Sequence, residues 1–432
     1  MLPKILLGVG LFATLFSVLI FSCKIPVGNC KEANKARGDV VLWGTLPEQD
    51  MSALTQEFNP KAKTYAVRYK YVAEAEFEQR LVEAIASGQG PDMIIAPYQT
   101  ILAETDRITP FKISEKLFRD AFIDGASVLL TQSGALALPV SIEPMMLFYN
   151  RTLFSKHGVI SPPTYWDEIV TLAPLLTVRQ GGQFVESAIA LGTPTVPYAK
   201  DILMTIVAQL GQTPVVQTVD QNGEAYNSVQ VNEPVTAGSE ILPLASANRF
   251  FTQFGDPGQN AFTWAQAQTG NPADFFVGEK LAMYIGYYGE YQKLRERNPR
   301  GDFQMTMLPQ TRNYNTKVTG MRMYAIATLK TTKNPLASMT VEQDFASAGV
   351  APTIARIIGG VPAFRTYPGT PSLDPALASS LLVARGWYDR YAIQSTGYAA
   401  TMISDIINYR YGVNDATTIF IARLRDLYAK KF

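Results

Sequence analysis

Histidine and cysteine are scarce in this chain of 432 residues, which has one histidine and two cysteines. A zinc site needs a cluster of such side chains, and a nucleophile–histidine triad would have to use the single His157. The sequence has neither a Gly-x-Ser-x-Gly elbow nor a Walker A loop, and Gly8-Val9-Gly10 only begins a dinucleotide fingerprint. We therefore expect no cofactor, no metal site and no enzyme. Paired carboxylates of the glycosidase type remain an alternative that residues alone do not exclude.

Charged residues are also few, at 17% of the chain, and the net charge is only +1. Without a long basic run the chain has no electrostatic footprint for nucleic acid, so we expect no such partner. A hydrophobic fraction of 47% is typical of globular proteins. The length exceeds that of one ordinary core and predicts two domains.

The N-terminal residues form a targeting pattern. Lys4 is followed by the apolar residues 5–21, which together predict a secretory signal peptide over residues 1–22. An uncleaved membrane anchor is the alternative, because about 20 apolar residues span a bilayer core.

The sequence Ile20-Phe21-Ser22-Cys23 resembles the bacterial lipobox, although Phe21 is bulkier than that motif prefers. The resemblance implies that Cys23 is lipidated and becomes the first residue of the mature protein. Residues 23–38 would then be a polar tether, with Cys30 as a passive member. Such a protein would be lipid-anchored on the outer side of the cell membrane.

The folded part begins with alternating strand and helix patterns. Apolar runs or alternation predict strands at 39–44, 65–71 and 91–96, and helical spacing predicts helices at 51–58 and 77–85. This βαβαβ order indicates an α/β domain with a mostly parallel sheet. Ligands bind at the carboxyl ends of strands in such sheets, which makes Trp43, Gly44 and Tyr98 candidate site residues.

The middle of the chain contains an unusual stretch at 138–168. It predicts strands at 138–140 and 145–149, with Glu143 alone on the loop between them. A short helix stopped by Gly158 follows. Next comes a helix opened by the capping box Thr164-Tyr165-Trp166-Asp167.

A second informative stretch at 273–288 reads as a helix, a Gly-Glu-Lys turn and a strand ending in Tyr287 and Tyr288. Strands at 303–309, 318–320 and 323–328 and the segment Gly359-Gly360-Val361-Pro362-Ala363-Phe364-Arg365 follow. In order and spacing, the chain from residue 39 to 432 resembles the solute-binding proteins of bacterial ABC importers, of the maltose-binding-like (family 1) type.

The resemblance implies a two-lobed fold of the periplasmic-binding-protein type II, with a mostly parallel sheet flanked by helices in each lobe and a ligand cleft between lobes. The implied N-terminal lobe comprises residues 39–141 and 316–350, and the C-terminal lobe residues 142–315 and 351–432. The crossings fall near Ser141, Asn315 and Val350. A monomer would capture a small solute, most simply a carbohydrate, by hinge closure and deliver it to ABC permease subunits.

Sugar binding needs aromatic faces for the C–H groups and polar groups for the hydroxyls. In the resembled family a glutamate at the position of Glu143 accepts hydrogen bonds from sugar hydroxyls, so Glu143 is the predicted polar anchor. Trp43 is equally compatible with the core, Arg322 with a surface ion pair, and only one of the two adjacent tyrosines faces inward if the strand alternates. The predicted ligand-binding residues are Glu143, Trp264, Tyr287, Tyr288, Trp43, Gly44, Tyr98 and Arg322.

Two other functions fit the same sequence. One is a binding protein that presents its ligand to a sensor instead of a transporter. The other is a membrane-tethered glycan hydrolase, which would need two carboxylates at catalytic separation.

Overall fold

The computed structural model describes residues 38–62, 65–219, 225–236, 239–366 and 373–429. The predicted signal peptide, the lipidation site Cys23, Cys30 and nearly all of the tether lie outside the described residues. Within them, no helix is long and apolar enough to cross a membrane.

The chain divides into two compact units, each made of two separate segments. The first unit is Met1–Glu143 with Arg322–Leu373, and the second is Pro144–Met321 with Asp374–Phe432. The chain passes between the units three times, and the first two of these positions, after Glu143 and after Met321, lie close to the crossings expected near Ser141 and Asn315. The third lies well beyond the expected Val350.

The first unit contains a sheet whose strands run in the order β2-β1-β3-β13-β6. Its elements are β1 (Gly38–Gly44), α3 (Glu48–Ala62), β2 (Tyr65–Tyr71), η1 (Glu74–Glu76), α4 (Phe77–Ala86), β3 (Met93–Pro97), α5 (Tyr98–Ala103), η2 (Thr105–Arg107), α6 (Glu115–Ala121), η3 (Asp124–Leu129), β4 (Leu130–Thr131), β5 (Gly134–Ala135), the first part of β6 (Leu138–Asn150), most of β13 (Thr319–Thr328), α14 (Pro335–Phe345) and α15 (Ala351–Ile358).

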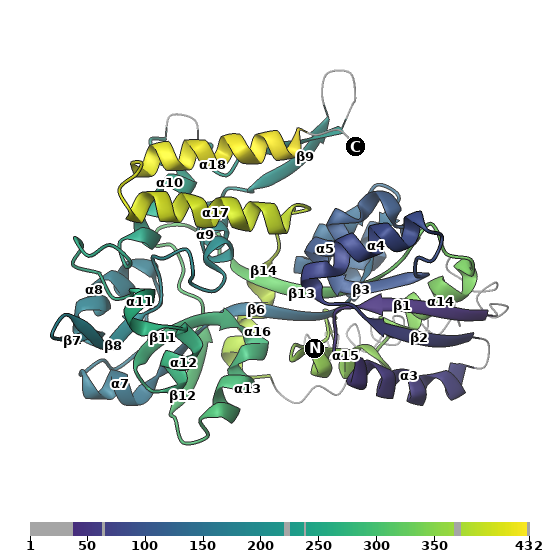
Figure 1. The fold of residues 1–432 in the computed structure, drawn as a ribbon, viewed down its shortest axis with the longest axis horizontal. Helices are drawn as coiled ribbons and strands as arrows, with labels where there is room; N and C mark the ends of the chain where they lie inside the picture. Colours follow the sequence, from purple (N-terminus) through teal and green to yellow (C-terminus); the bar gives the residue numbers. More distant parts are fainter. Residues whose placement is uncertain (1–37, 63–64, 220–224, 237–238, 367–372, 430–432) are drawn as a thin grey trace, which may run out of the picture. The chain divides into compact units, whose positions relative to one another are not determined.

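The predicted βαβαβ unit is confirmed. β1 pairs in parallel with β2 and with β3, and β13 joins β3 in antiparallel orientation. The crossovers through α3 and α4 run in opposite directions along the sheet, so the two helices cover opposite faces. Figure 1 shows α4 and α5 on one side of these strands and α3 on the other.

Helix α3 extends past its predicted end at Asn59-Pro60, because a proline in the last turn removes only one helical hydrogen bond. The Asn59 amide instead ties the helix to β2: its Nδ2 donates to the carbonyl of Val67 over 3.1 Å, and its Oδ1 accepts from the Val67 amide over 2.8 Å. This bridge sets where the chain turns back into the sheet.

The second unit has a sheet with the order β6-β11-β8-β7, and β12 pairs with β6. Its remaining elements are α7 (Arg151–Lys156), α8 (Trp166–Leu176), β7 (Val178–Gln180), β8 (Gln183–Ile189), α9 (Ala199–Gln209), β9 (Val215–Val219), β10 (Ala225–Val229), α10 (Pro243–Thr252), α11 (Gln266–Thr269), α12 (Pro272–Val277), β11 (Leu281–Tyr287), α13 (Tyr288–Arg297), β12 (Phe303–Met307), α16 (Pro375–Val383), β14 (Ala384–Arg385), α17 (Ala392–Ile407) and α18 (Val413–Tyr428).

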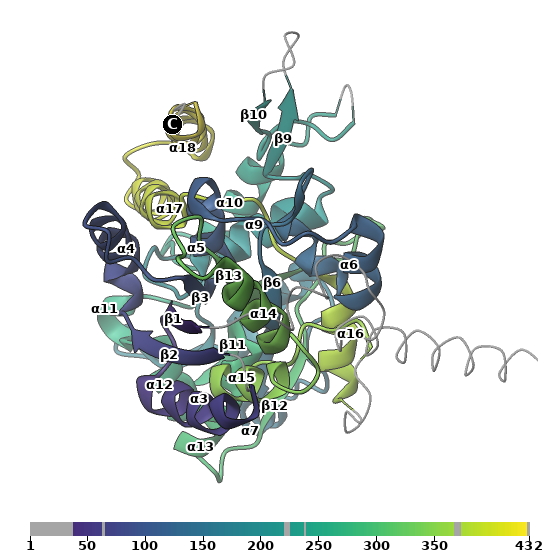
Figure 2. The same ribbon diagram turned by 90° about the vertical axis from the view of Figure 1, so that its right-hand side faces the viewer.

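The last two helices, α17 and α18, lie side by side in both views (Figure 1, Figure 2). The predicted apolar face of the C-terminal helix is confirmed, because Phe420, Leu424, Leu427 and Tyr428 of α18 are all buried. α10 packs against this pair and against α9. Helix α9 also contacts α17 directly, so these four helices pack together.

Strand β6 corrects the sequence interpretation. The two predicted strands and their loop are one continuous strand of 13 residues, so Glu143 lies within a strand and not on a loop. Pro139 and Pro144 both lie within this strand, although each lacks an amide donor. Likewise, the strands predicted at 318–320 and 323–328 are the single strand β13.

The start of α8 also differs in detail from its prediction. The amides of Thr164 and Tyr165 donate to Oε2 of Glu168 over 2.7 and 3.2 Å, so Glu168 is the capping acid. Asp167 instead forms an ion pair with Arg312 at 2.9 Å. Both acids still belong to the first turn, where the helix dipole favours them.

Candidate functional site

In the first unit the structure brings together two predicted site residues, Glu143 of β6 and Arg322 of β13. Nε of Arg322 donates to Oε1 of Glu143 over 2.9 Å, and Nη2 donates to Oε2 over 2.8 Å. This two-pronged geometry is the strongest form of an arginine–carboxylate pair. The Glu143 side chain is only 1% exposed, whereas that of Arg322 is 30% exposed. The guanidinium is thus the accessible member of the pair, and the carboxylate holds it.

The chain after α15 runs beside this part of β6 in antiparallel orientation. Ile142 exchanges two backbone hydrogen bonds with Val361, at 2.8 and 3.0 Å. A Cβ at Gly360 would lie 2.9 Å from Cγ of Glu143 and equally close to the carbonyl of Ile142. Only glycine fits there, and the close approach restricts the side chain of Glu143.

A row of half-exposed polar groups continues from this pair. Arg322 and Tyr324 lie two residues apart on β13 and share one face. Tyr324 is paired in register with Pro97 at the carboxyl end of β3, and Thr45 follows the carboxyl end of β1. Burial raises the pKa of the Tyr324 phenol, so it stays protonated and can donate a hydrogen bond at neutral pH.

The other predicted residues of the first unit have packing roles in this structure. Trp43 is buried, and Nζ of Lys70 lies 4.3 Å from the centroid of its ring. Tyr98 is buried at the start of α5. A Cβ at Gly44 would lie 2.8 Å from the hydroxyl of Tyr69 and from the carbonyl of Ile95. Of the two alternatives open for Trp43, the core position is the one observed.

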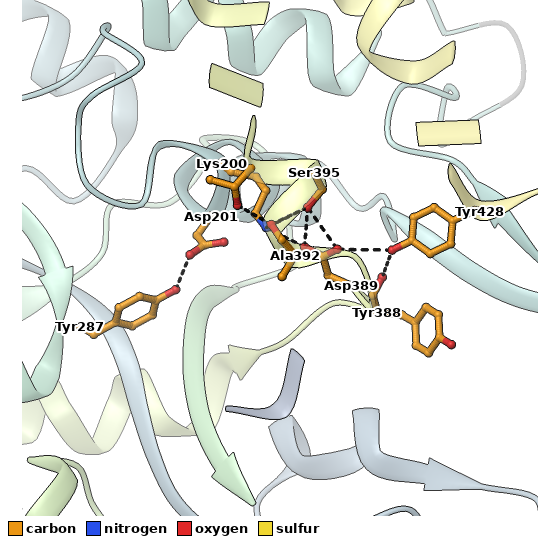
Figure 3. Close-up of polar contacts among 9 residues, drawn as sticks. Lys200, Asp201, Tyr287, Tyr388, Asp389, Ala392, Ser395 and Tyr428 are labelled. Carbon is orange, nitrogen blue, oxygen red and sulfur yellow. Dashed lines mark hydrogen bonds and ion pairs between the residues drawn. The ribbon is translucent and has the colours of Figure 1, made fainter. Parts of the chain in front are cut away.

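In the second unit, Tyr287 lies at the end of β11, and its hydroxyl donates to Oδ2 of Asp201 over 2.8 Å (Figure 3). The ring of Tyr198 packs edge-on against the Tyr287 ring, with centroids 4.7 Å apart and an interplanar angle of 70°. Tyr287 is itself buried, whereas Tyr198 and Asp201 are partly exposed, so these two are the accessible members of the cluster.

Tyr198 has a left-handed backbone conformation, with φ of 59°, directly before α9. Residues other than glycine rarely adopt this region, at a cost of order 1 kcal/mol or more, and such outliers gather at functional sites. Neither Tyr198 nor Asp201 was predicted from the sequence. The only available signal was the Val-Pro-Tyr before an apolar helix, which predicts a turn but no backbone angle.

A second aromatic group lies on the segment 386–391 between β14 and α17. Trp387, Tyr388 and Tyr391 are all partly exposed there. Nζ of Lys200 in α9 is 5.3 Å from the centroid of the Trp387 ring. Sequence reasoning missed this segment, although the density of aromatics in Gly-Trp-Tyr-Asp-Arg-Tyr would have indicated it.

The sequence also matches a family model. Residues 53–367 match the model described as bacterial extracellular solute-binding protein. The chain belongs to this family. The predicted membership among solute-binding proteins is therefore confirmed, and the family's description confirms the predicted extracytoplasmic location. No curated protein matches this solute-binding protein in sequence.

Several solved structures share the fold of this chain. The sugar-binding protein MalE from Xanthomonas citri has a TM-score of 0.71 at 17% identity, over 90% of this chain and 97% of that one. The GacH receptor of Streptomyces glaucescens, solved unliganded and with acarbose, has a TM-score of 0.69 at 17% identity, over 92% and 100%. The ABC substrate-binding protein Lmo0181 from Listeria monocytogenes, solved with cycloalternan, has a TM-score of 0.68 at 14% identity, over 91% and 100%. The predicted α/β fold class is thereby confirmed.

Two further residues that were predicted to bind the ligand, Trp264 and Tyr288, differ in how exposed they are. Trp264 was expected to be exposed because its neighbours are polar, but it is fully buried and packs edge-on against Phe275 at 5.8 Å. Trp264 is buried because the neighbouring Thr263 faces inward and its hydroxyl forms a hydrogen bond with the hydroxyl of Ser187, which holds this segment in the core. Tyr288 is half-buried as the first residue of α13, and burial raises its pKa.

Outside these clusters, the structure also describes the surroundings of the single histidine. His157 follows α7 as predicted, and its Nε2 lies 2.7 Å from Oε2 of Glu186. A surface cavity of about 330 Å³ beside α7 is lined by Tyr149, Phe154 and Ile160 among others, and none of the predicted site residues lines it. In the described part of the chain no three His, Cys, Asp or Glu side chains are grouped as metal ligands would be.

Proposed function

We propose that this solute-binding protein captures a carbohydrate outside the cytoplasmic membrane and delivers it to an ABC importer without converting it. The observation that carries the proposal is the cluster of Tyr198, Tyr287 and Asp201. It combines an aromatic edge-to-face pair with a carboxylate held at 2.8 Å by a phenol. Aromatic faces suit the C–H faces of sugar rings, and carboxylates accept from their hydroxyls. Structures of the same fold hold cycloalternan and acarbose, which fits this class of solute.

In the first unit we assign the direct contact to Arg322. Its guanidinium is 30% exposed while Glu143 is 1% exposed, so the arginine donates to solute hydroxyls and the glutamate fixes its plane. The original prediction made Glu143 the anchor. We now assign Glu143 a positioning role, because both of its carboxylate oxygens accept from Arg322.

The membrane tether and the partner complete the proposal. Lipidation at Cys23 would keep the protein at the outer surface of the membrane, next to the permease that takes up the released sugar. The hinge closure implied by the family resemblance stays a prediction, which small-angle scattering with and without a bound sugar tests.

The function is tested by a thermal-shift screen with maltotetraose, mannobiose, acarbose and several monosaccharides. A ligand at 100 times its Kd adds about 2.7 kcal/mol to the free energy of unfolding. We expect at least one sugar to raise Tm and to be recovered intact by mass spectrometry. A screen in which no sugar shifts Tm would refute carbohydrate binding, and cleavage of the bound sugar would instead favour the hydrolase.

The assignment to Arg322 is tested with Arg322→Met. A hydrogen bond from a charged donor contributes about 1.5–3 kcal/mol, so Kd should rise by roughly 10- to 100-fold. Arg107→Met is the matched control, because Arg107 is 41% exposed and forms a 2.6 Å ion pair with Glu104, which is 3% exposed in the same unit. If both variants bind the sugar as tightly as the wild type does, Arg322 does not contact the solute.

A further inference from the structure

The first turn of α9 contacts two different parts of the second unit through consecutive residues. Asp201 accepts from Tyr287 at the end of β11, while Lys200 reaches Asp389 on the segment 386–391 at 2.6 Å. Figure 3 shows the two side chains leaving the turn toward these different partners. Successive helical residues differ by about 100° in direction, which allows one turn to serve both contacts.

Lys200 has three polar partners, all on the segment 386–391 or the first turn of α17. Its Nζ donates to Oδ2 of Asp389 at 2.6 Å, to Oγ of Ser395 at 3.1 Å and to the carbonyl of Ala392 at 3.3 Å. An ammonium group has three donors, so the geometry uses all of them. Lys200, Asp389 and Ser395 are all buried.

The segment is also held from the other side by α18. The hydroxyl of Tyr428 donates to the carbonyl of Tyr388 over 3.0 Å and approaches Oδ1 of Asp389 at 3.5 Å. The hydroxyl of Ser395 adds a 2.9 Å bond to Oδ2 of Asp389. Every contact of this buried network therefore involves the segment that carries Trp387 or the helix that follows it (Figure 3).

A buried ion pair is a poor source of stability, since desolvation offsets most of the attraction and apolar replacements of both members are often neutral. What such a pair does supply is one defined arrangement of the groups around it. We propose that the Lys200–Asp389 pair is a positioning device that holds the segment 386–391, and with it the Trp387 ring, in a fixed place relative to Tyr198 and Tyr287. Its effect on binding rests on the proposed carbohydrate function, whereas its effect on the segment does not.

The test compares Lys200→Met with the double variant Lys200→Met/Asp389→Leu. The single variant leaves a buried carboxylate without its cation and should lower Tm clearly, whereas the double variant should recover most of that loss. Lys156→Met is the control, because Lys156 pairs with Glu186 in the same unit and is 56% exposed. It should change neither Tm nor the exchange and binding readouts described next.

The decisive readouts are made on the double variant. Hydrogen exchange of the sugar-free protein should be at least about tenfold faster over residues 386–391 than in the wild type, because the segment opens locally. Kd for maltotetraose, or for whichever sugar of the screen binds, should rise about tenfold, because the loosened aromatic side chains must be ordered on binding.

A double variant with wild-type Tm, wild-type exchange over 386–391 and wild-type Kd would overturn the proposal and leave the pair a merely structural contact. Faster exchange with an unchanged Kd would also overturn it, since the held segment would then not serve binding. If the wild type binds no sugar, the carbohydrate function fails on its own, and the exchange measurement still decides whether the pair holds the segment.

Discussion

Glu342 of α14 gives a stability prediction whose magnitude follows from its surroundings. The side chain is fully buried in the first unit, and Oγ1 of Thr328 donates to its Oε2 over 2.6 Å. Its Oε1 has no hydrogen-bond partner among the described residues. Burial raises the pKa of this carboxyl from 4.5 to about 8, and the bond from Thr328 only partly opposes the rise. At pH 7 the folded protein therefore keeps Glu342 mostly protonated.

The sign of the pH dependence follows from proton binding. Between pH 4.5 and about 8 the folded protein holds a proton on Glu342 that the unfolded chain has released. The free energy of unfolding therefore falls as the pH rises through this window. A pKa difference of this size corresponds to roughly 5 kcal/mol at most, at about 1.4 kcal/mol per pH unit. Glu342→Gln keeps the shape of the side chain and removes its titration.

We expect Glu342→Gln to differ little from the wild type below pH 5. By pH 8 it should be more stable by several kcal/mol. Urea unfolding at pH 5 and pH 8 measures both gaps. Glu115→Gln, which removes an exposed carboxylate paired with Arg119 at 2.7 Å, is the control and should show no such change. An equal gap between Glu342→Gln and the wild type at both pH values would refute the reasoning.

Two further substitutions test features of the site. Gly360→Ala would place a Cβ 2.9 Å from Cγ of Glu143. We expect the free energy of unfolding, measured with urea, to fall by about 1–3 kcal/mol and sugar binding to weaken. If neither changes, the close approach at Gly360 does not restrict Glu143. Tyr198→Gly relieves the backbone strain at φ of 59° but removes the aromatic ring. Tm should therefore change little, while Kd for the sugar should rise. An unchanged Kd, measured by calorimetry, would show that Tyr198 does not contact the sugar.

Periodicity predicted β2 and α4 well because each has one buried side. Tyr65 and Val67 of β2 and Phe77 and Leu81 of α4 are buried at the spacing their sequences display. It failed for β6, where all residues but one are buried, so that alternation is absent. Long-range hydrogen bonding, which no local pattern contains, makes that strand continuous.

The site was predictable only where a single side chain was distinctive. Glu143 was identified because a lone carboxylate in an apolar stretch is conspicuous, yet its partner Arg322 lies 179 positions away along the chain. Lys200 was overlooked, although a lysine next to the apolar run of α9 was a usable signal. Trp264 was misjudged because the polarity of neighbouring residues does not report which way an indole points.

The order of synthesis has a consequence for the first unit. Its sheet places β13 between β3 and β6, but most of β13 follows the segment Pro144–Met321 in the chain. A nascent chain therefore cannot complete this sheet until residue 328 has emerged, and the long sequence separation slows the pairing further. The first unit can therefore complete its fold only after most of the chain has been synthesised, later than its N-terminal position in the sequence would suggest.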